Sequence, residues 1–272
     1  MQTSDNEKMN EVIRFALISI AWSWVWWIPR ILSTYEVITL NPILDVLLGL
    51  IGALGPGLAA VYMLNRTEGR ASLGAFFKQG WSLRFNALLL APAVMIMPVI
   101  GVIAGLFLQV TGTENPWQYS LLALTGYPPV LTVAALLAGA IGQEIGWRGF
   151  LQQRLQGFLN PLRTSLVLGV IWAAWQLPLH FVYGTLQSVM PVFHIVLQSV
   201  ALSILFTWLY NKSGGSTLVA ALFQFSISLC GVLFPVWAGI LTIWIYLILI
   251  VLAIVGLGMA VGVYNYRRKS QL

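Results

Sequence analysis

A short polar run interrupts an apolar stretch near the middle of the chain, and it contains one carboxylate and one guanidinium. Glu144 and Arg148 stand four residues apart, acid before base, in the segment GQEIGWRGF of residues 142–150. On a helix this spacing lets the two side chains face each other and pair. At membrane depth an ionisable side chain costs about 2.5–3.5 kcal/mol, so each one requires a reason. The pair is consistent either with an ion pair that anchors a helix end or with part of a catalytic site.

Three later apolar segments carry polar residues that could complete such a site. They are Gln176 and His180 in one segment, His194 and Gln198 in the next, and Gln224, Ser226 and Ser228 in the third. Polar groups on several helices indicate either one interior cavity or a hydrogen-bonded bundle core. Between membrane helices a hydrogen bond of this kind contributes about 0.6 kcal/mol. We interpret Gln198 and Ser226 as interhelical bonds of that kind.

A shifted acid–base or metal site could in principle be built from His180, His194 and Glu144, which offer two imidazoles and one carboxylate. No His-Glu-x-x-His signature supports it. His180 precedes Phe181 at the expected end of a span, which favours a place in an interfacial aromatic belt. Ser228 has no base within its helix turn that would make it a nucleophile. We therefore expect no metal and no cofactor.

The elements that must position these residues are membrane helices. Charged residues make up 8% of the 272 residues, hydrophobic residues 59%, and the mean hydropathy is +0.86. A soluble domain carries roughly 25% charged residues, and disorder requires low hydrophobicity, so both classes are excluded. One cysteine, Cys230, excludes a disulfide framework. The net charge of +6 is not gathered into a nucleic-acid-binding surface, so we expect the lipid bilayer and no nucleic acid as partner.

A bilayer core needs about 20 apolar residues per helix, and this length predicts an all-α polytopic bundle of about eight spans. The expected spans are 12–33, 42–64, 87–111, 121–145, 163–183, 190–210, 216–236 and 238–264. No small-residue cleavage site follows the first span, so we interpret it as a retained helix. No repeat or linker divides the chain, and we expect a single integral-membrane domain over residues 1–272.

The basic residues predict the orientation, because short cytoplasmic loops carry an excess of Lys and Arg. With both termini inside, twelve of the fourteen basic residues fall on the cytoplasmic side: Lys8, Arg14, Arg66, Arg70, Lys78, Arg84, Arg154, Arg163, Lys212, Arg267, Arg268 and Lys269. We expect cytoplasmic termini and a location in the cell membrane. The segment 65–86 mixes basic with aromatic residues, so it is either an interfacial amphipathic helix or a solvated loop with aromatic anchors.

Three short motifs between about residues 120 and 235 resemble those of the CPBP family, the intramembrane endopeptidases that include CAAX prenyl proteases and bacteriocin-processing and immunity proteins. The family's Glu-Glu-x-x-Trp-Arg-Gly is similar to residues 143–149, and its Trp-x-x-Trp-His-x-Pro to residues 172–178. Its His-x-x-x-Asn, after a Gly-Gly-Ser entry, is similar to residues 224–228 after 214–216. The resemblance implies about eight helices and peptide-bond hydrolysis without a cofactor.

The positions that carry the chemistry differ from the family pattern. The resemblance places the water-activating Glu and His at Gln143 and Gln176, and the oxyanion-holding His and Asn at Gln224 and Ser228. An amide cannot act as a general base near pH 7. Loss of a general base costs about 10²–10⁴-fold, and loss of an oxyanion donor about 10²–10³-fold. As written, the chain is therefore expected to be catalytically inactive.

The framework is kept while the reactive positions are exchanged, and two origins fit this pattern: a natural pseudoprotease, or a variant inactivated by near-isosteric replacement. The candidate site consists of the family positions Gln143, Glu144, Arg148, Gln176, Gln224 and Ser228. A different hypothesis is a non-catalytic binding or immunity module that holds a peptide, a lipid or a partner helix. A small-molecule transporter is a third; no inverted repeat supports it, although prolines at 92, 98, 128 and 129 interrupt two spans.

Overall fold

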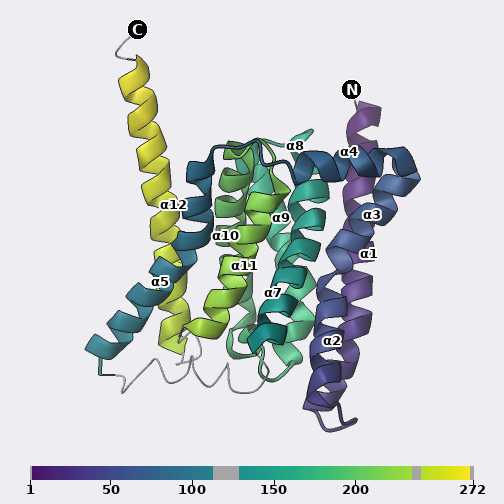
Figure 1. Cartoon of the computed structure of the whole chain (residues 1–272), viewed down its shortest axis with the longest axis vertical. Coiled ribbons are helices and arrows are strands. Elements are labelled where there is room, and N and C mark those ends of the chain that lie inside the picture. The colour runs from purple at the N-terminus through teal and green to yellow at the C-terminus, as the bar shows by residue number, and fades with distance from the viewer. Residues whose placement is uncertain (1, 113–128, 235–239, 270–272) are drawn as a thin grey trace.

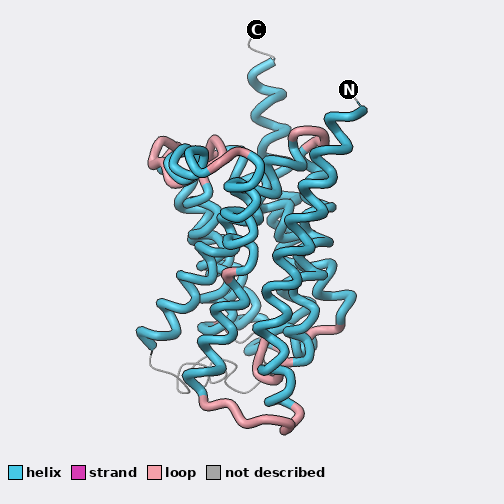
Figure 2. The backbone as a smooth tube through the Cα atoms, turned by 90° about the vertical axis from the view of Figure 1, so that its right-hand side faces the viewer, coloured by secondary structure: helices cyan, strands magenta, loops and turns pink. Residues whose placement is uncertain are grey.

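The computed structural model describes residues 2–112, 129–234 and 240–269, and the regular elements within these ranges are helices (Figures 1 and 2). The described part of each of the eight expected spans contains a helical segment. In chain order the helices are α1 (Gln2–Thr34), α2 (Pro42–Ala53), α3 (Gly55–Thr67), α4 (Arg70–Gly80), η1 (Ala87–Leu89), α5 (Leu90–Val110), α7 (Pro129–Glu144), η2 (Ile145–Gln152), α8 (Gln153–Gln156), α9 (Pro161–Gln176), η3 (Leu177–Phe181), η4 (Leu186–Val189), α10 (Val192–Lys212), α11 (Thr217–Leu233) and α12 (Ile240–Lys269).

The chain is an all-α integral membrane protein. Among the described residues, six helical stretches are long and apolar enough to cross a bilayer, and the shorter Thr217–Leu233 is apolar as well. In the stretches Ala87–Val110 and Ile240–Met259, only 28% of the most apolar window is buried inside the protein. Such an apolar outer surface requires lipid around it.

The second expected span is divided into two helices, α2 and α3, because Pro56 interrupts the pattern of helical backbone hydrogen bonds. Proline has no N–H to donate to the carbonyl of Gly52. That carbonyl instead accepts a hydrogen bond of 2.7 Å from the Ser23 hydroxyl of α1. The break between α2 and α3 therefore also ties this segment to the first helix.

The fifth expected span is a helical stretch over Pro161–Phe181, but its last turn is not α-helical, because Pro178 cannot continue the α-helix. α9 ends at Gln176, and the tighter 3₁₀ turn η3 follows. Gln176 and His180 are therefore not one α-helical turn apart. Parts of other expected spans, at 121–128, 235–236 and 238–239, lie outside the described residues.

The start of α1, the end of α12, α4 and α8 all lie at one end of the bundle (Figure 1). This is the end at which the sequence places most of its basic residues. α4 lies across the bundle there, so the segment after residue 65 contains a helix rather than only a loop. Its Leu73 and Phe76 pack against the core, whereas Lys78 and Gln79 are exposed.

The motif-bearing helix contacts the α2–α3 turn through small residues. A Cβ atom at Gly142 would lie 2.5 Å from Cδ2 of Leu54, and one at Gly146 would lie 2.4 Å from the carbonyl carbon and oxygen of Pro56. A Cβ atom at Gly57 would in turn lie 2.6 Å from the carbonyl oxygen of Gly142. Small residues at four-residue spacing are what allow two membrane helices to approach this closely.

We expect Gly146→Ala to destabilise the protein by about 1–3 kcal/mol, because the added methyl group overlaps a backbone that cannot move independently. The measurement is thermal unfolding in detergent. Unfolding is monitored with a thiol-reactive dye, which labels the buried thiol of Cys230 once it becomes exposed. Gly256→Ala on α12 is the matched control, since a Cβ atom there meets nothing within 4 Å. Equal unfolding temperatures for the two variants would contradict the close approach.

Candidate functional site

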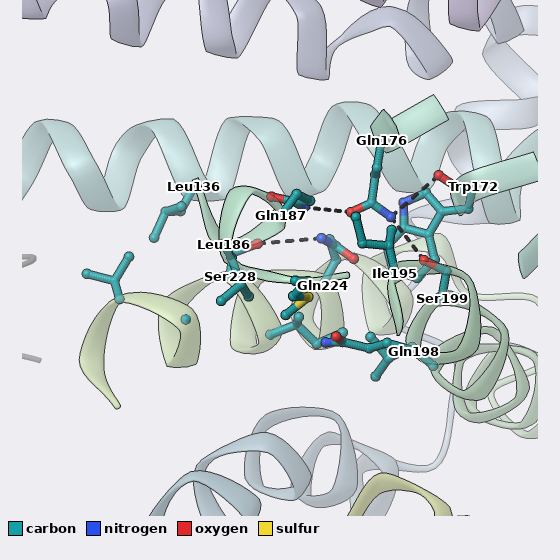
Figure 3. A pocket seen from close by; sticks show the side chains of 15 residues that line it. Leu136, Trp172, Gln176, Leu186, Gln187, Ile195, Gln198, Ser199, Gln224 and Ser228 are labelled. Atoms are coloured by element: carbon teal, nitrogen blue, oxygen red, sulfur yellow. Dashed lines mark hydrogen bonds between the residues drawn. The ribbon is translucent and has the colours of Figure 1, made fainter. Parts of the chain in front are cut away.

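Three of the four exchanged family positions lie around one cavity of about 230 Å³ (Figure 3). Gln176 reaches it from the end of α9, and Gln224 and Ser228 from successive turns of α11. The cavity is also lined by Leu136, Trp172, Leu186, Gln187, Met190, Ile195, Gln198, Ser199, Leu202, Ile227, Gly231 and Val232. Its polar wall among the described residues thus consists of amides and hydroxyls.

Hydrogen bonds connect these amides across three elements. Nε2 of Gln187, in η4, donates to Oε1 of Gln176 at 2.7 Å. Nε2 of Gln176 lies 3.2 Å from the Ser199 hydroxyl of α10 and 3.4 Å from the carbonyl oxygen of Trp172. Both ends of the Gln176 amide are therefore engaged, which fixes its orientation in the cavity wall (Figure 3).

The amide of Gln224 is held less completely. Its Nε2 lies 3.5 Å from the hydroxyl oxygen of Ser228, one turn further along α11. Its carbonyl oxygen is buried and accepts no hydrogen bond within the described part of the chain. A buried acceptor without a partner costs about 1–3 kcal/mol. This oxygen is therefore an unsatisfied acceptor on a side chain that lines the cavity.

Gln143, the fourth exchanged position, is not among the residues that line this cavity. The α7 residue in the lining is Leu136, seven positions earlier. Seven residues keep Gln143 on the same face of the helix but displace it by about 10 Å along the axis. Three of the four exchanged positions thus line one cavity, and Gln143 lies about two turns along α7 from its lining residue Leu136, nearer the basic end of the bundle.

Glu144 and Arg148 form a fully buried ion pair. Nη1 of Arg148 donates to Oε1 of Glu144 at 2.9 Å, and neither side chain is exposed. The guanidinium carbon lies 3.6 Å from the ring centre of Phe206 and 5.3 Å from that of Trp172. Trp172 lines the cavity with part of its surface, so the ion pair lies behind the cavity wall. Helix geometry changes here, because the π-helical η2 begins directly after Glu144.

The tryptophans of the motifs attach α1 to this centre. Trp147 makes edge contacts with Trp175 and Phe15, at ring-centre distances of 5.6 and 5.7 Å. The indole N–H of Trp175 donates to the hydroxyl of Ser23 at 2.6 Å, and its ring lies 4.9 Å from that of Trp27. Trp147 and Trp175 therefore hold α1 against the motif-bearing helices, and neither residue lines the cavity.

The histidines do not join Glu144. Nδ1 of His180 lies 3.0 Å from the carbonyl oxygen of Gln187, whereas His194 is buried with its ring 4.9 Å from that of Trp244. Within the described ranges no three His, Cys, Asp or Glu side chains are grouped so that they could hold a metal ion. The alternative site of His180, His194 and Glu144 is therefore wrong.

Two polar residues of the cavity were not expected from the sequence. Gln187 lies in the short connection before α10, where a polar residue gives no signal, and Ser199 is one serine among several on α10. Gln198, which we expected to form an interhelical hydrogen bond, lines the cavity. Ser226 does form such a bond, donating to the carbonyl of Val94 on α5 at 2.9 Å.

Fold and site together define a helical membrane protein with the framework of an intramembrane protease. Residues 125–230 match the family model of the Type II CAAX prenyl endopeptidase Rce1-like proteins. The chain is also 25% identical, over 194 residues, to CAAX prenyl protease 2 of Methanococcus maripaludis, which covers 68% of this chain and 71% of that protein. Both matches support a relationship of the chain to the CPBP/CAAX protease family.

We expect Glu144→Gln to destabilise the protein by about 3–5 kcal/mol, because it leaves the charge of Arg148 buried without a counterion. Adding Arg148→Met should recover part of the lost stability. A double-mutant cycle measures this coupling from the unfolding temperatures of the two single variants and the double variant, with unfolding detected by labelling of the Cys230 thiol.

Asp45→Asn provides the comparison, since Asp45 and its partner Arg30 are 28% and 15% exposed and water can compensate them. Equal losses for Glu144→Gln and Asp45→Asn would contradict a special role of the buried pair.

Proposed function

We propose that this protein is a non-hydrolytic member of the family that holds a short segment of a membrane-associated peptide or protein in its amide-lined cavity. The observation that carries the proposal is the chemistry of the cavity wall. Its described polar groups come from Gln176, Gln187, Gln198, Ser199, Gln224 and Ser228. None of these side chains can take a proton from water near pH 7.

The same groups suit a peptide backbone. Amides both donate and accept hydrogen bonds, as a peptide unit does, and the buried carbonyl oxygen of Gln224 offers an acceptor for a backbone N–H. A volume of about 230 Å³ is below the roughly 300–1,000 Å³ of drug-sized ligand pockets. The cavity therefore admits a short extended segment rather than a folded partner.

We further propose that the bundle end with α4 and α8 faces the cytoplasm and that the protein resides in the cell membrane. The reason is the gathering of basic residues at that end, which the positive-inside rule places on the cytoplasmic side (Figure 1).

We expect the chain as written to release no product from a prenylated CAAX peptide, the substrate type named by its relative. The combined change Gln143→Glu, Gln176→His, Gln224→His and Ser228→Asn should raise hydrolysis by about 10²-fold or more, because it restores a general base and oxyanion donors. The assay is mass-spectrometric detection of the cleaved peptide in proteoliposomes.

The matched control carries the three cavity changes but keeps Gln143, and it should stay inactive if the carboxylate at 143 is the general base. Hydrolysis by the unchanged chain would overturn the proposed lack of activity. A folded four-fold variant that binds but does not cleave would contradict the proposed loss of chemistry at these positions.

For orientation, we expect a membrane-impermeant maleimide on intact cells to label Tyr183→Cys and to leave Lys212→Cys unlabelled. Tyr183 is 88% exposed and follows η3, whereas Lys212 ends α10 at the basic end of the bundle. Both variants are made in a Cys230→Ser background, and permeabilised cells serve as control. The reverse labelling pattern would invert the proposed topology.

A further inference from the structure

A second concave site lies at the basic end of the bundle, outside the membrane cavity. It is an open groove of about 740 Å³ between α4 with the residues after it and the α10–α11 turn. We call it the α4 groove, and define it by Lys78, Trp81, Ser82 and Arg84 on one wall and Ser213 and Ser216 on the other. Ser216 is the last residue of the Gly-Gly-Ser entry of the third motif, and none of these residues stands at a family position that carries the chemistry.

The α4 groove has one sign of charge. Lys78 and Arg84 both line it, and no described lining residue is acidic. Within the described residues, neither side chain is in an ion pair, in contrast to Arg30, Arg148 and Arg154. Two unneutralised cations facing one concavity attract an anion.

The walls of the α4 groove are fixed in place. A Cβ atom at Gly80 would lie 2.7 Å from the Thr217 hydroxyl, and one at Gly149 would lie 2.9 Å from Cζ of Phe76, so α4 is seated directly on α11 and η2. In the opposite wall, Ser213 donates to the carbonyl of Tyr210 at 2.9 Å. Neither wall has to form when a ligand arrives, which reduces the ordering cost of binding.

The surroundings of the α4 groove identify the source of the anion. The α4 side of the groove lies between a bilayer-crossing stretch that ends at Thr67 and another that begins at Ala87, so the groove is at the level of the membrane interface. Leu83 and Leu88, on either side of Arg84 in the sequence, are each 77% exposed. The indole of Trp81 lines the groove, and tryptophan is enriched at the depth of lipid headgroups.

We propose that the α4 groove binds the phosphate of an anionic glycerophospholipid headgroup, with Lys78 and Arg84 as its cationic ligands and the Ser82 hydroxyl and Gln79 amide as further donors. The exposed leucines then contact the acyl chains. Charge-assisted hydrogen bonds to phosphate oxygens are the contacts that Lys and Arg make best. This proposal does not depend on what the membrane cavity binds.

The test is a titration of the purified full-length protein with dioctanoyl phosphatidylglycerol, dioctanoyl phosphatidylcholine or inorganic phosphate. Binding is followed as a rise in unfolding temperature, measured through the Cys230 thiol. We expect phosphatidylglycerol to raise this temperature at concentrations at which phosphatidylcholine and inorganic phosphate do not.

In Lys78→Gln/Arg84→Gln we expect the half-maximal phosphatidylglycerol concentration to rise about 30-fold, since each basic side chain near an anionic lipid surface contributes about fivefold. Without lipid its unfolding temperature should match that of the unchanged protein. Arg70→Gln/Lys212→Gln removes the same charge from exposed positions outside the α4 groove and should leave the titration unchanged.

Three results would overturn the proposal. No response of the unchanged protein to phosphatidylglycerol would exclude the site. Equal weakening in both double variants would assign the effect to net charge rather than to the α4 groove. An equal response to inorganic phosphate would show a site for free anions and exclude the lipid assignment.

Discussion

The rest of the structure depends on the buried ion pair between Glu144 and Arg148. Two charges without exposure to water are stable only while each compensates the other, so the helix that carries them must hold its geometry. The guanidinium also lies against Phe206 and Trp172, which fixes α9 and α10 around it. Because Trp172 lines the cavity, the position of the cavity wall follows from the position of this pair.

The framework residues of the three motifs have structural tasks that do not require hydrolysis. Trp147 and Trp175 hold α1, while Gly146 and Gly149 permit the close approach of Pro56 and Phe76. Replacing any of them would disturb the packing of α1, α3 or α4 against the motif-bearing helices. Of the four exchanged positions, Gln176, Gln224 and Ser228 line the cavity, whereas Gln143 lies about two turns further along α7. The scaffold thus accommodates neutral polar side chains at these four positions.

Hydropathy and motif spacing predicted the helices and the Glu144–Arg148 contact, because both depend on local periodicity. They did not predict the break between α2 and α3, since the carbonyl freed by Pro56 is satisfied by Ser23, which is distant in sequence. The sequence also did not predict that Gln143 lies outside the cavity lining, because this depends on how far α7 is shifted along its axis relative to α11. The place of Gln187 in the cavity wall was not predictable from the sequence, because its hydrogen bond to Gln176 joins a connecting turn to the end of a helix.

The exchanged positions also change the electrostatics of the membrane interior. A hydrolytic site of this family type needs a carboxylate and imidazoles at membrane depth, and their burial opposes folding unless other groups compensate them. Enzymes commonly accept such a loss of stability in return for activity. Here the described cavity wall is neutral, and the nearby charges of Glu144 and Arg148 cancel each other. The amides and hydroxyls of this wall offer both donors and acceptors, so they can form hydrogen bonds with a neutral amide, which is the group that a peptide backbone presents.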